Sequence, residues 1–198
     1  MLVCALGAPL RVAETNYTEG KTLVLRLNEK ARQLYEEGKA LKVHYHCIHL
    51  SKGWHNQYLF CFLQVETPSE VAAVSDPPLM IRSEDKCDPD SLKTNPETCL
   101  SRVVLALKNY SRIFGESGIF QGQNTKCDKW RANATAIAVV TEQILEALKE
   151  PSETPTPMMM ANWMTEGYLC RDSVERLYSF SIMTARVFSH LSSLQQND

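Results

Sequence analysis

Apolar residues recur at helical spacing in four long stretches of the chain, and each stretch predicts a helix. The predicted helices cover residues 22–43, 99–114, 132–149 and 166–194. The second is the most regular, with one apolar face made of Leu100, Val103, Val104, Leu107, Tyr110 and Phe114. No stretch sustains the apolar/polar alternation of a half-buried strand, although residues 57–65 have the composition of one. The pattern predicts an all-α protein.

The connections between the predicted helices favour one topology. Roughly fifty residues separate the first helix from the second, and about fifteen separate each later pair. Parallel neighbours in a bundle need a connection as long as a helix, whereas antiparallel neighbours can be joined by a short turn. A long first connection and an extended, proline-rich third one therefore predict an up-up-down-down four-helix bundle.

Composition and charge fit one globular domain and argue against two kinds of partner. The chain has 198 residues, of which 44% are hydrophobic, and a formal net charge of −2. Without a concentrated basic face, neither nucleic acid nor an anionic membrane is expected as the main partner. We interpret residues 1–15, which are apolar and rich in small side chains, as a signal peptide or its remnant. Residues 16–198 form the single predicted domain.

Cysteine usage and glycosylation sequons predict secretion. Seven cysteines are many for a cytosolic chain of this length. Sequons of the form Asn-X-Ser/Thr begin at Asn16, Asn109 and Asn133. Asn109 lies half a turn away from Leu100 on the second predicted helix, so we expect it to face solvent and to accept a glycan.

Cys87 and Cys99 enclose a polar loop directly before the second predicted helix. Their separation is too long for the paired thiols of a zinc site or a redox motif, so we predict a disulfide. Such a bond stabilises by about 3 kcal/mol in the chain-entropy model. Cys47 and Cys170 form a second candidate pair, and the pairing of Cys61 and Cys127 stays open.

Three histidines and a cysteine lie within six residues, at His44, His46, Cys47 and His49. Neither helical nor strand spacing collects all four, so we favour a polar exit from the first helix and expect no metal or cofactor. A secreted zinc-binding protein is the alternative. No nucleophile elbow and no phosphate-binding glycine loop is found in the sequence, which argues against an enzyme.

The last predicted helix carries more apolar residues than one face of a bundle helix buries: Leu177, Tyr178, Phe180, Ile182, Met183, Ala185, Val187, Phe188 and Leu191. A small bundle cannot easily enclose one helix on every side, so another protein is expected to cover part of it. Arg186 lies among these residues, with Ile182 and Met183 one turn before it. Ser189 and His190 follow one turn later. Arg186 either extends over core residues or anchors a protein interface.

A methionine-rich segment, PMMMANWMTEGY, precedes this helix and contains Trp163 and Met164. Methionine side chains adapt to irregular apolar surfaces. The segment either packs over the end of the bundle or presents Trp163 to a second partner.

Three of these segments together resemble a known family. CDPDSLKTNPETCL (87–100), NYSRIFGESGIFQG (109–122) and TARVFSHL (184–191) are similar, in order and spacing, to the interleukin-23 alpha-subunit family. That family consists of four-helix cytokine chains of the long-chain type, within the interleukin-6/interleukin-12 superfamily. The resemblance covers residues 87–122 and about 163–194.

The resemblance implies a secreted cytokine subunit that pairs with the interleukin-12 beta subunit. In that family, the arginine that matches Arg186 enters a pocket of the beta subunit, and its neighbours complete the implied contact: Ile182, Met183, Ser189 and His190. Trp163 or Met164 is implied to contact the interleukin-23 receptor, while the interleukin-12 receptor beta-1 chain completes the receptor pair. An interleukin-12 alpha-type subunit, or a helical cytokine acting alone, is the alternative.

Ser83 marks a departure from the family pattern. The interchain cysteine of the family lies four residues before the first loop cysteine, and here that position is Ser83. A covalent link to the beta subunit is therefore absent, or is moved to another thiol such as Cys61 or Cys127.

Overall fold

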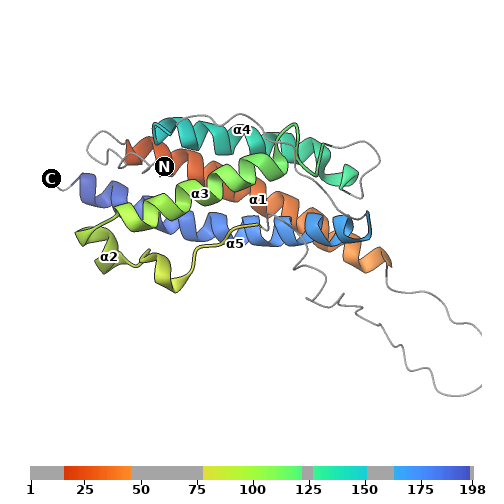
Figure 1. Cartoon of the computed structure of the whole chain (residues 1–198), viewed down its shortest axis with the longest axis horizontal. Coiled ribbons are helices and arrows are strands. Elements are labelled where there is room, and N and C mark those ends of the chain that lie inside the picture. The colour runs from red at the N-terminus through yellow and green to blue at the C-terminus, as the bar shows by residue number, and fades with distance from the viewer. Residues whose placement is uncertain (1–15, 46–77, 122–126, 151–162, 197–198) are drawn as a thin grey trace, which may run out of the picture.

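The computed structural model describes residues 16–45, 78–121, 127–150 and 163–196 (Figure 1). These segments contain five α-helices: α1 (Tyr17–Tyr45), α2 (Pro89–Thr94), α3 (Glu97–Phe114), α4 (Arg131–Ala147) and α5 (Trp163–Gln195). Two short 3₁₀ turns, η3 (Ser83–Asp85) and η4 (Asp128–Trp130), precede α2 and α4. The described segments contain no strand, so the predicted all-α class is confirmed.

The four long helices form an up-up-down-down bundle. In Figure 1, α1 and α3 run in one direction and α4 and α5 in the other. Helix α1 packs against α4 and α5, and α3 packs against α4. The antiparallel register of α1 and α5 is fixed by two ring contacts, Tyr17 with Phe188 and Tyr35 with Tyr178. The predicted topology is therefore confirmed.

The helix ends follow local capping chemistry. Helix α1 begins five residues earlier than predicted, because Asn16 Oδ1 accepts a hydrogen bond from the Glu19 N–H at 3.1 Å. Helix α2, which the periodicity did not predict, has only six residues. Its start is set by Asp88, whose side chain accepts from the Ser91 N–H, and by Pro89 in the first helical position.

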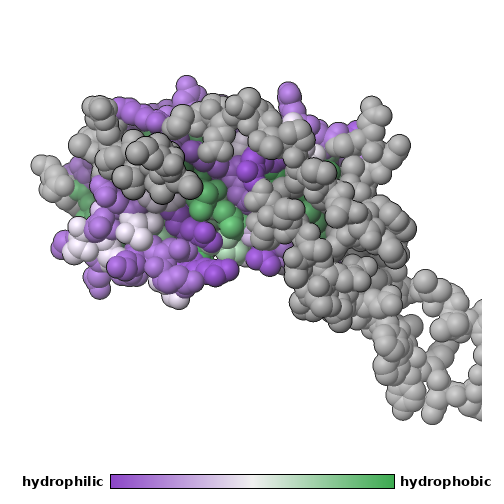
Figure 2. All heavy atoms as spheres, in the orientation of Figure 1, coloured by the Kyte–Doolittle hydropathy of each residue, from purple (hydrophilic) through white to green (hydrophobic). Residues whose placement is uncertain are grey.

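The core lies between the long helices and is rich in aromatic rings. Phe114 stacks on Phe120 with ring centroids 4.4 Å apart, and the ring centroids of Tyr110 and Phe180 are 5.1 Å apart. Burial of such large apolar side chains is the main favourable term in folding. Among the residues whose burial is described, the exposed large apolar side chains are scattered over three helices, one on each, at Leu25, Leu105 and Val139. On the face shown in Figure 2, hydrophilic residues predominate around α2, and hydrophobic residues surface in a small patch near the middle.

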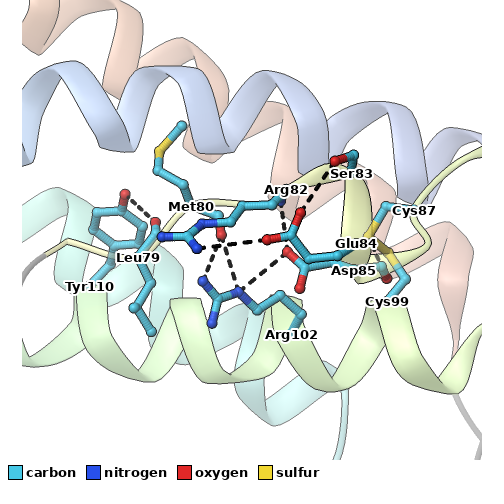
Figure 3. A network of polar contacts seen from close by, with 10 residues as sticks. All are labelled: Leu79, Met80, Arg82, Ser83, Glu84, Asp85, Cys87, Cys99, Arg102 and Tyr110. Carbon is cyan, nitrogen blue, oxygen red and sulfur yellow. Dashed lines mark hydrogen bonds and ion pairs between the residues drawn. A yellow bond between two sulfur atoms is a disulfide. The ribbon is translucent and has the colours of Figure 1, made fainter.

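The end of the long first connection, residues 78–86, is called the crossover segment below, and it lies between α3 and α5 (Figures 1 and 3). Leu79, Met80 and Ile81 pack against the core, and α2, which follows, packs against α5. Helices α3 and α5 make few direct contacts with each other. The crossover segment and α2 therefore add a partial extra layer to the four-helix bundle.

Side chains of α3 hold the backbone of the crossover segment (Figure 3). The Leu79 N–H donates to Asn109 Oδ1 at 3.1 Å, and the Leu79 carbonyl accepts from the Tyr110 hydroxyl at 2.8 Å. Arg102 donates twice to the Met80 carbonyl, at 3.1 and 2.9 Å. These bonds satisfy backbone groups that would otherwise be buried without partners.

Asp85 extends this network toward η3. Its carboxylate lies 3.5 Å from Arg102 Nε and accepts the Arg82 N–H at 2.7 Å. The Arg102 and Asp85 side chains are 21% and 17% exposed, so this ion pair is largely shielded from water. The turn that contains Ser83 is thereby tied to α3.

Asn109 is buried, and the prediction that it faces solvent is wrong. The residue is only 4% exposed. Its position half a turn from Leu100 does point it away from the centre of the four-helix core. The crossover segment, however, covers that side of α3, and Asn109 binds Leu79 there.

Two disulfides connect the described segments. Cys87 pairs with Cys99, with Cα atoms 5.0 Å apart, which confirms the predicted bond at the start of α3. Cys127 pairs with Cys170, with Cα atoms 5.7 Å apart, so the predicted alternative of Cys47 with Cys170 is wrong. The reason is that α4 and α5 are parallel and begin at the same end of the bundle (Figure 1). Cys127 directly precedes η4 and α4, so it lies at the end where Cys170 of α5 is found. Cys127 is fully buried and is therefore not a free thiol for an interchain bond.

Candidate partner-binding surface on α5

Helix α5 has a wide buried side and a narrow outward side. Its buried side carries most of the large apolar residues singled out in the sequence, namely Leu177, Phe180, Val187, Phe188 and Leu191. Tyr178 is half-buried and stacks on Tyr35 of α1, with ring centroids 4.9 Å apart. The expectation that a small bundle could not enclose this helix is wrong for the five buried residues, because α2 packs on α5 in addition to α1. The other four residues, Tyr178, Ile182, Met183 and Ala185, are only half-buried.

Arg186 lies on the outward side and is exposed. Its Nη1 atom is 3.9 Å from Met183 Sδ, which is a weak contact. Over the described ranges, no carboxylate lies within ion-pair distance of Arg186. The guanidinium is therefore oriented along α5 but is not neutralised by any of the described residues.

The other arginines of α5 are paired within the helix. Arg171 Nε lies 3.0 Å from Glu175, and Arg176 Nε lies 2.8 Å from Asp172. Each pair has the one-turn spacing at which opposite charges attract on a helix surface. Arg186 has Ile182 and His190 at that spacing instead, so its own helix offers it no acid.

The residues around Arg186 lie between core and surface. Ile182, Met183, Ser189 and His190 are all half-buried. An exposed guanidinium flanked by partly covered aliphatic side chains is suited to a carboxylate held in an apolar pocket of another protein. Arginine is also enriched among the residues that dominate binding energy at interfaces. The structure thus brings together all five residues predicted for partner binding.

Ser83 lies at the exposed surface, in η3. Its hydroxyl donates to Glu84 Oε2 at 3.2 Å. A side chain at this position is therefore accessible, and its backbone is held through Asp85 and Arg102. Arg102, which holds the crossover segment and Asp85, was not among the residues predicted from the sequence. The sequence feature that could have indicated its role is its position, since it is a charged residue between the buried Leu100 and Val103.

Several predicted residues lie outside the described part of the chain. His46, Cys47, His49 and Cys61 are in undescribed ranges, and the side chains of His44, Trp163 and Met164 are likewise not described. Among the described residues, no group of three His, Cys, Asp or Glu side chains is arranged to hold a metal ion. None of the described helices is long and apolar enough to cross a membrane.

The fold and this surface define a class of protein: a helical cytokine bundle with a candidate docking surface on its last helix. A family model described as interleukin 23 subunit alpha matches residues 47–192, and the chain belongs to this family. The matched range is wider than the segments that carried the resemblance, and it begins after α1. Membership implies a cytokine subunit, which points away from an enzyme.

Individual relatives agree with this assignment. The chain is 31% identical over 113 residues to interleukin-23 subunit alpha of Mus musculus, covering 56% of this chain and 57% of that relative. It is 32% identical over 130 residues to the protein of the same name from Sus scrofa, and the match covers 63% of this chain and 62% of that relative. It is 31% identical over 130 residues to interleukin-23 subunit alpha of Cavia porcellus, and the match covers 64% of this chain and 68% of that relative. The chain thus spans about six tenths of the length of the first two relatives.

Proposed function

We propose that this chain is a secreted cytokine subunit that docks through α5 on the interleukin-12 beta subunit to form an interleukin-23-like heterodimer. The observation that carries the proposal is the exposed Arg186, which has no carboxylate partner in the described ranges and is flanked by half-buried Ile182 and Met183. Family membership supplies the expected partner. The heterodimer then acts in immune and inflammatory signalling.

The physical basis is charge-assisted hydrogen bonding in a desolvated pocket. A guanidinium can donate two parallel hydrogen bonds to one carboxylate, a geometry that the lysine ammonium does not reproduce. Removing Arg186 would leave the carboxylate of the partner buried without its counter-charge. Truncation of one member of such a pair typically costs about 2–5 kcal/mol of binding free energy.

We assign a second partner-binding surface to the N-terminal end of α5. Trp163 and Arg186 belong to the same helix, and at 1.5 Å per residue they are separated by roughly 34 Å along its axis. Two partners can therefore bind α5 at the same time. We assign Trp163, with Met164 beside it, to the interleukin-23 receptor, while the interleukin-12 receptor beta-1 chain completes the signalling complex.

Co-expression with the beta subunit tests the proposal. We expect poor secretion of the chain alone, rescue of secretion by the beta subunit, and loss of rescue with Arg186→Ala. Arg171→Ala is the matched control, because it removes an arginine of the same helix that already has a partner, Glu175. Good secretion of a monomer that signals unaided would contradict the heterodimer.

Receptor binding is tested separately. We expect Trp163→Ala to leave co-secretion with the beta subunit unchanged and to weaken binding of the heterodimer to the interleukin-23 receptor. Receptor binding that survives Trp163→Ala, Met164→Ala and the double variant would contradict the assignment of this end of α5.

A further inference from the structure

The fold uses the side chains of the sequon asparagines in different ways. Asn16 is exposed, and its Oδ1 caps α1 by accepting from the Glu19 N–H at 3.1 Å. An N-linked glycan replaces one hydrogen on Nδ2 and leaves Oδ1 unchanged. Within the described ranges, Nδ2 of Asn16 has no hydrogen-bond partner. A glycan at Asn16 is therefore compatible with the helix cap and projects into solvent.

Asn109 is the opposite case. It is 4% exposed, its Oδ1 accepts from the Leu79 N–H at 3.1 Å, and its Nδ2 is enclosed without a partner in the described residues. The next residue, Tyr110, donates its hydroxyl to the carbonyl of the same Leu79 at 2.8 Å. Two consecutive α3 residues thus hold both polar backbone groups of Leu79.

A glycan on Asn109 is incompatible with this arrangement. The first sugar would occupy the volume filled by the crossover segment and would displace Leu79 from α3. It would also place many hydroxyl groups against core residues, where unsatisfied polar groups are strongly unfavourable. Because glycans are added to the unfolded chain, a molecule modified at Asn109 could not close the crossover segment over α3.

Asn133 lies between these extremes. It is half-buried, and its Nδ2 donates to Glu37 Oε1 of α1 at 2.7 Å. One N–H would remain on Nδ2 after glycosylation, so the geometry does not decide its occupancy. For Asn16 and Asn109 the geometry does decide.

We infer that Asn16 is a glycan-bearing site of the folded protein and that Asn109 is bare in correctly folded protein, because a chain glycosylated at Asn109 could not close the crossover segment over α3. The inference rests on the secretory route in the proposed function and is independent of the beta subunit and the receptors. A side chain that matches a glycosylation sequon is thereby assigned a positioning role in the fold.

Site-resolved mass spectrometry tests this inference. The full chain, placed behind a cleavable secretion signal, is produced in eukaryotic cells, and its glycans are removed enzymatically in heavy-oxygen water. This reaction converts each glycosylated asparagine to a heavy-labelled aspartate. We expect the label at residue 16 and an unlabelled asparagine at residue 109. A bare Asn16, or a labelled residue 109 in secreted protein that retains both disulfides, would overturn the inference.

Two variants provide matched controls. Asn16→Asp removes the sequon but keeps a capping oxygen, so it should fold normally and lose the mass of one glycan. Ser111→Ala removes the Asn109 sequon and leaves its amide, and its mass should be unchanged apart from the lost oxygen. Loss of a glycan mass in Ser111→Ala would contradict the inference. Because the secretion signal is supplied, failure of the natural chain to be secreted is a separate result that bears only on the proposed function.

Discussion

The ring of Phe188 on α5 lies directly against the backbone of α1 at Gly20. A β-carbon placed at Gly20 would lie 2.5 Å from Phe188 Cε1, well inside van der Waals contact. In an ordinary helix interior, Gly→Ala stabilises by about 1 kcal/mol. Here the clash should reverse the sign, and we expect Gly20→Ala to lower the free energy of unfolding by about 1–3 kcal/mol in denaturant titrations.

Gly38 of the same helix is the control for this prediction. A β-carbon there would meet Trp130 Cζ2 at 3.6 Å, which is an ordinary contact. We therefore expect Gly38→Ala to raise the free energy of unfolding by roughly 0.5–1 kcal/mol. If both substitutions stabilised the protein equally, the close packing of α1 on α5 at Gly20 would be refuted.

Tyr110 should make stability depend on alkaline pH. Burial raises the pKa of its hydroxyl above the ordinary value, and the hydroxyl donates to the Leu79 carbonyl. In the unfolded chain Tyr110 ionises near pH 10, whereas in the folded protein it stays neutral, so ionisation favours unfolding. The contribution of the neutral Tyr110 hydroxyl to the free energy of unfolding is fully present below about pH 10. It is lost as the pH rises through the folded-state pKa.

The variant Tyr110→Phe separates the hydrogen bond of the Tyr110 hydroxyl from its ionisation. At neutral pH it should lower the free energy of unfolding by about 1 kcal/mol, since one buried hydrogen bond is lost. Above pH 10 its stability should fall less steeply with pH than that of the unmodified protein. The remaining slope should come partly from Tyr17, whose pKa is also raised by burial. An unchanged alkaline slope in Tyr110→Phe would refute this account of Tyr110.

The two disulfides should differ in their contribution to stability. Cys127 and Cys170 are separated by 43 residues, and Cys87 and Cys99 by 12. In the chain-entropy model, loops of these lengths correspond to about 4 and about 3 kcal/mol of stabilisation. We expect the double variant Cys127→Ser with Cys170→Ser to unfold at lower denaturant concentration than Cys87→Ser with Cys99→Ser. Equal midpoints, or the reverse order, would contradict this ranking.

Ser83 provides a test of where the beta subunit lies. The residue is exposed, and η3 is tied to α3 through Asp85 and Arg102. If the partner docks as in the related family, Ser83→Cys should form a disulfide-linked heterodimer, visible as a single band on a non-reducing gel. Lys93→Cys places a thiol at another exposed site, in the last turn of α2, and should not form a disulfide with the beta subunit. Linkage of both variants, or of neither, would argue against this docking geometry.

The class and topology were predictable because they depend on periodicity and connection length, which are local properties of the sequence. The helical stripe that contains Leu100, Val103 and Leu107 is buried as its spacing indicates. The same holds for Cys87 and Cys99, whose loop closes at the start of the second long helix. Such features need no knowledge of which distant segments meet.

Two of the errors share one physical cause, which is the extra layer formed by the crossover segment and α2. Helical spacing describes which side of α3 faces the other long helices, but it does not show that residue 79 covers the opposite side. Asn109 was therefore expected at the surface, and the apolar residues of α5 were expected to exceed what the chain could bury. The error over Cys170 has a different cause, because its pairing depends on which segments meet at one end of the bundle.

The role of Arg186 is the central claim, and the equilibrium dissociation constant for the beta subunit measures it most directly. Purified chain is titrated against immobilised beta subunit, together with the variants Arg186→Ala and Arg171→Ala. We predict that Arg186→Ala weakens binding by roughly 30-fold to several thousand-fold, which corresponds to about 2–5 kcal/mol, and that Arg171→Ala changes it less than about threefold. Binding by Arg186→Ala as tight as that of the unmodified chain would contradict the claim.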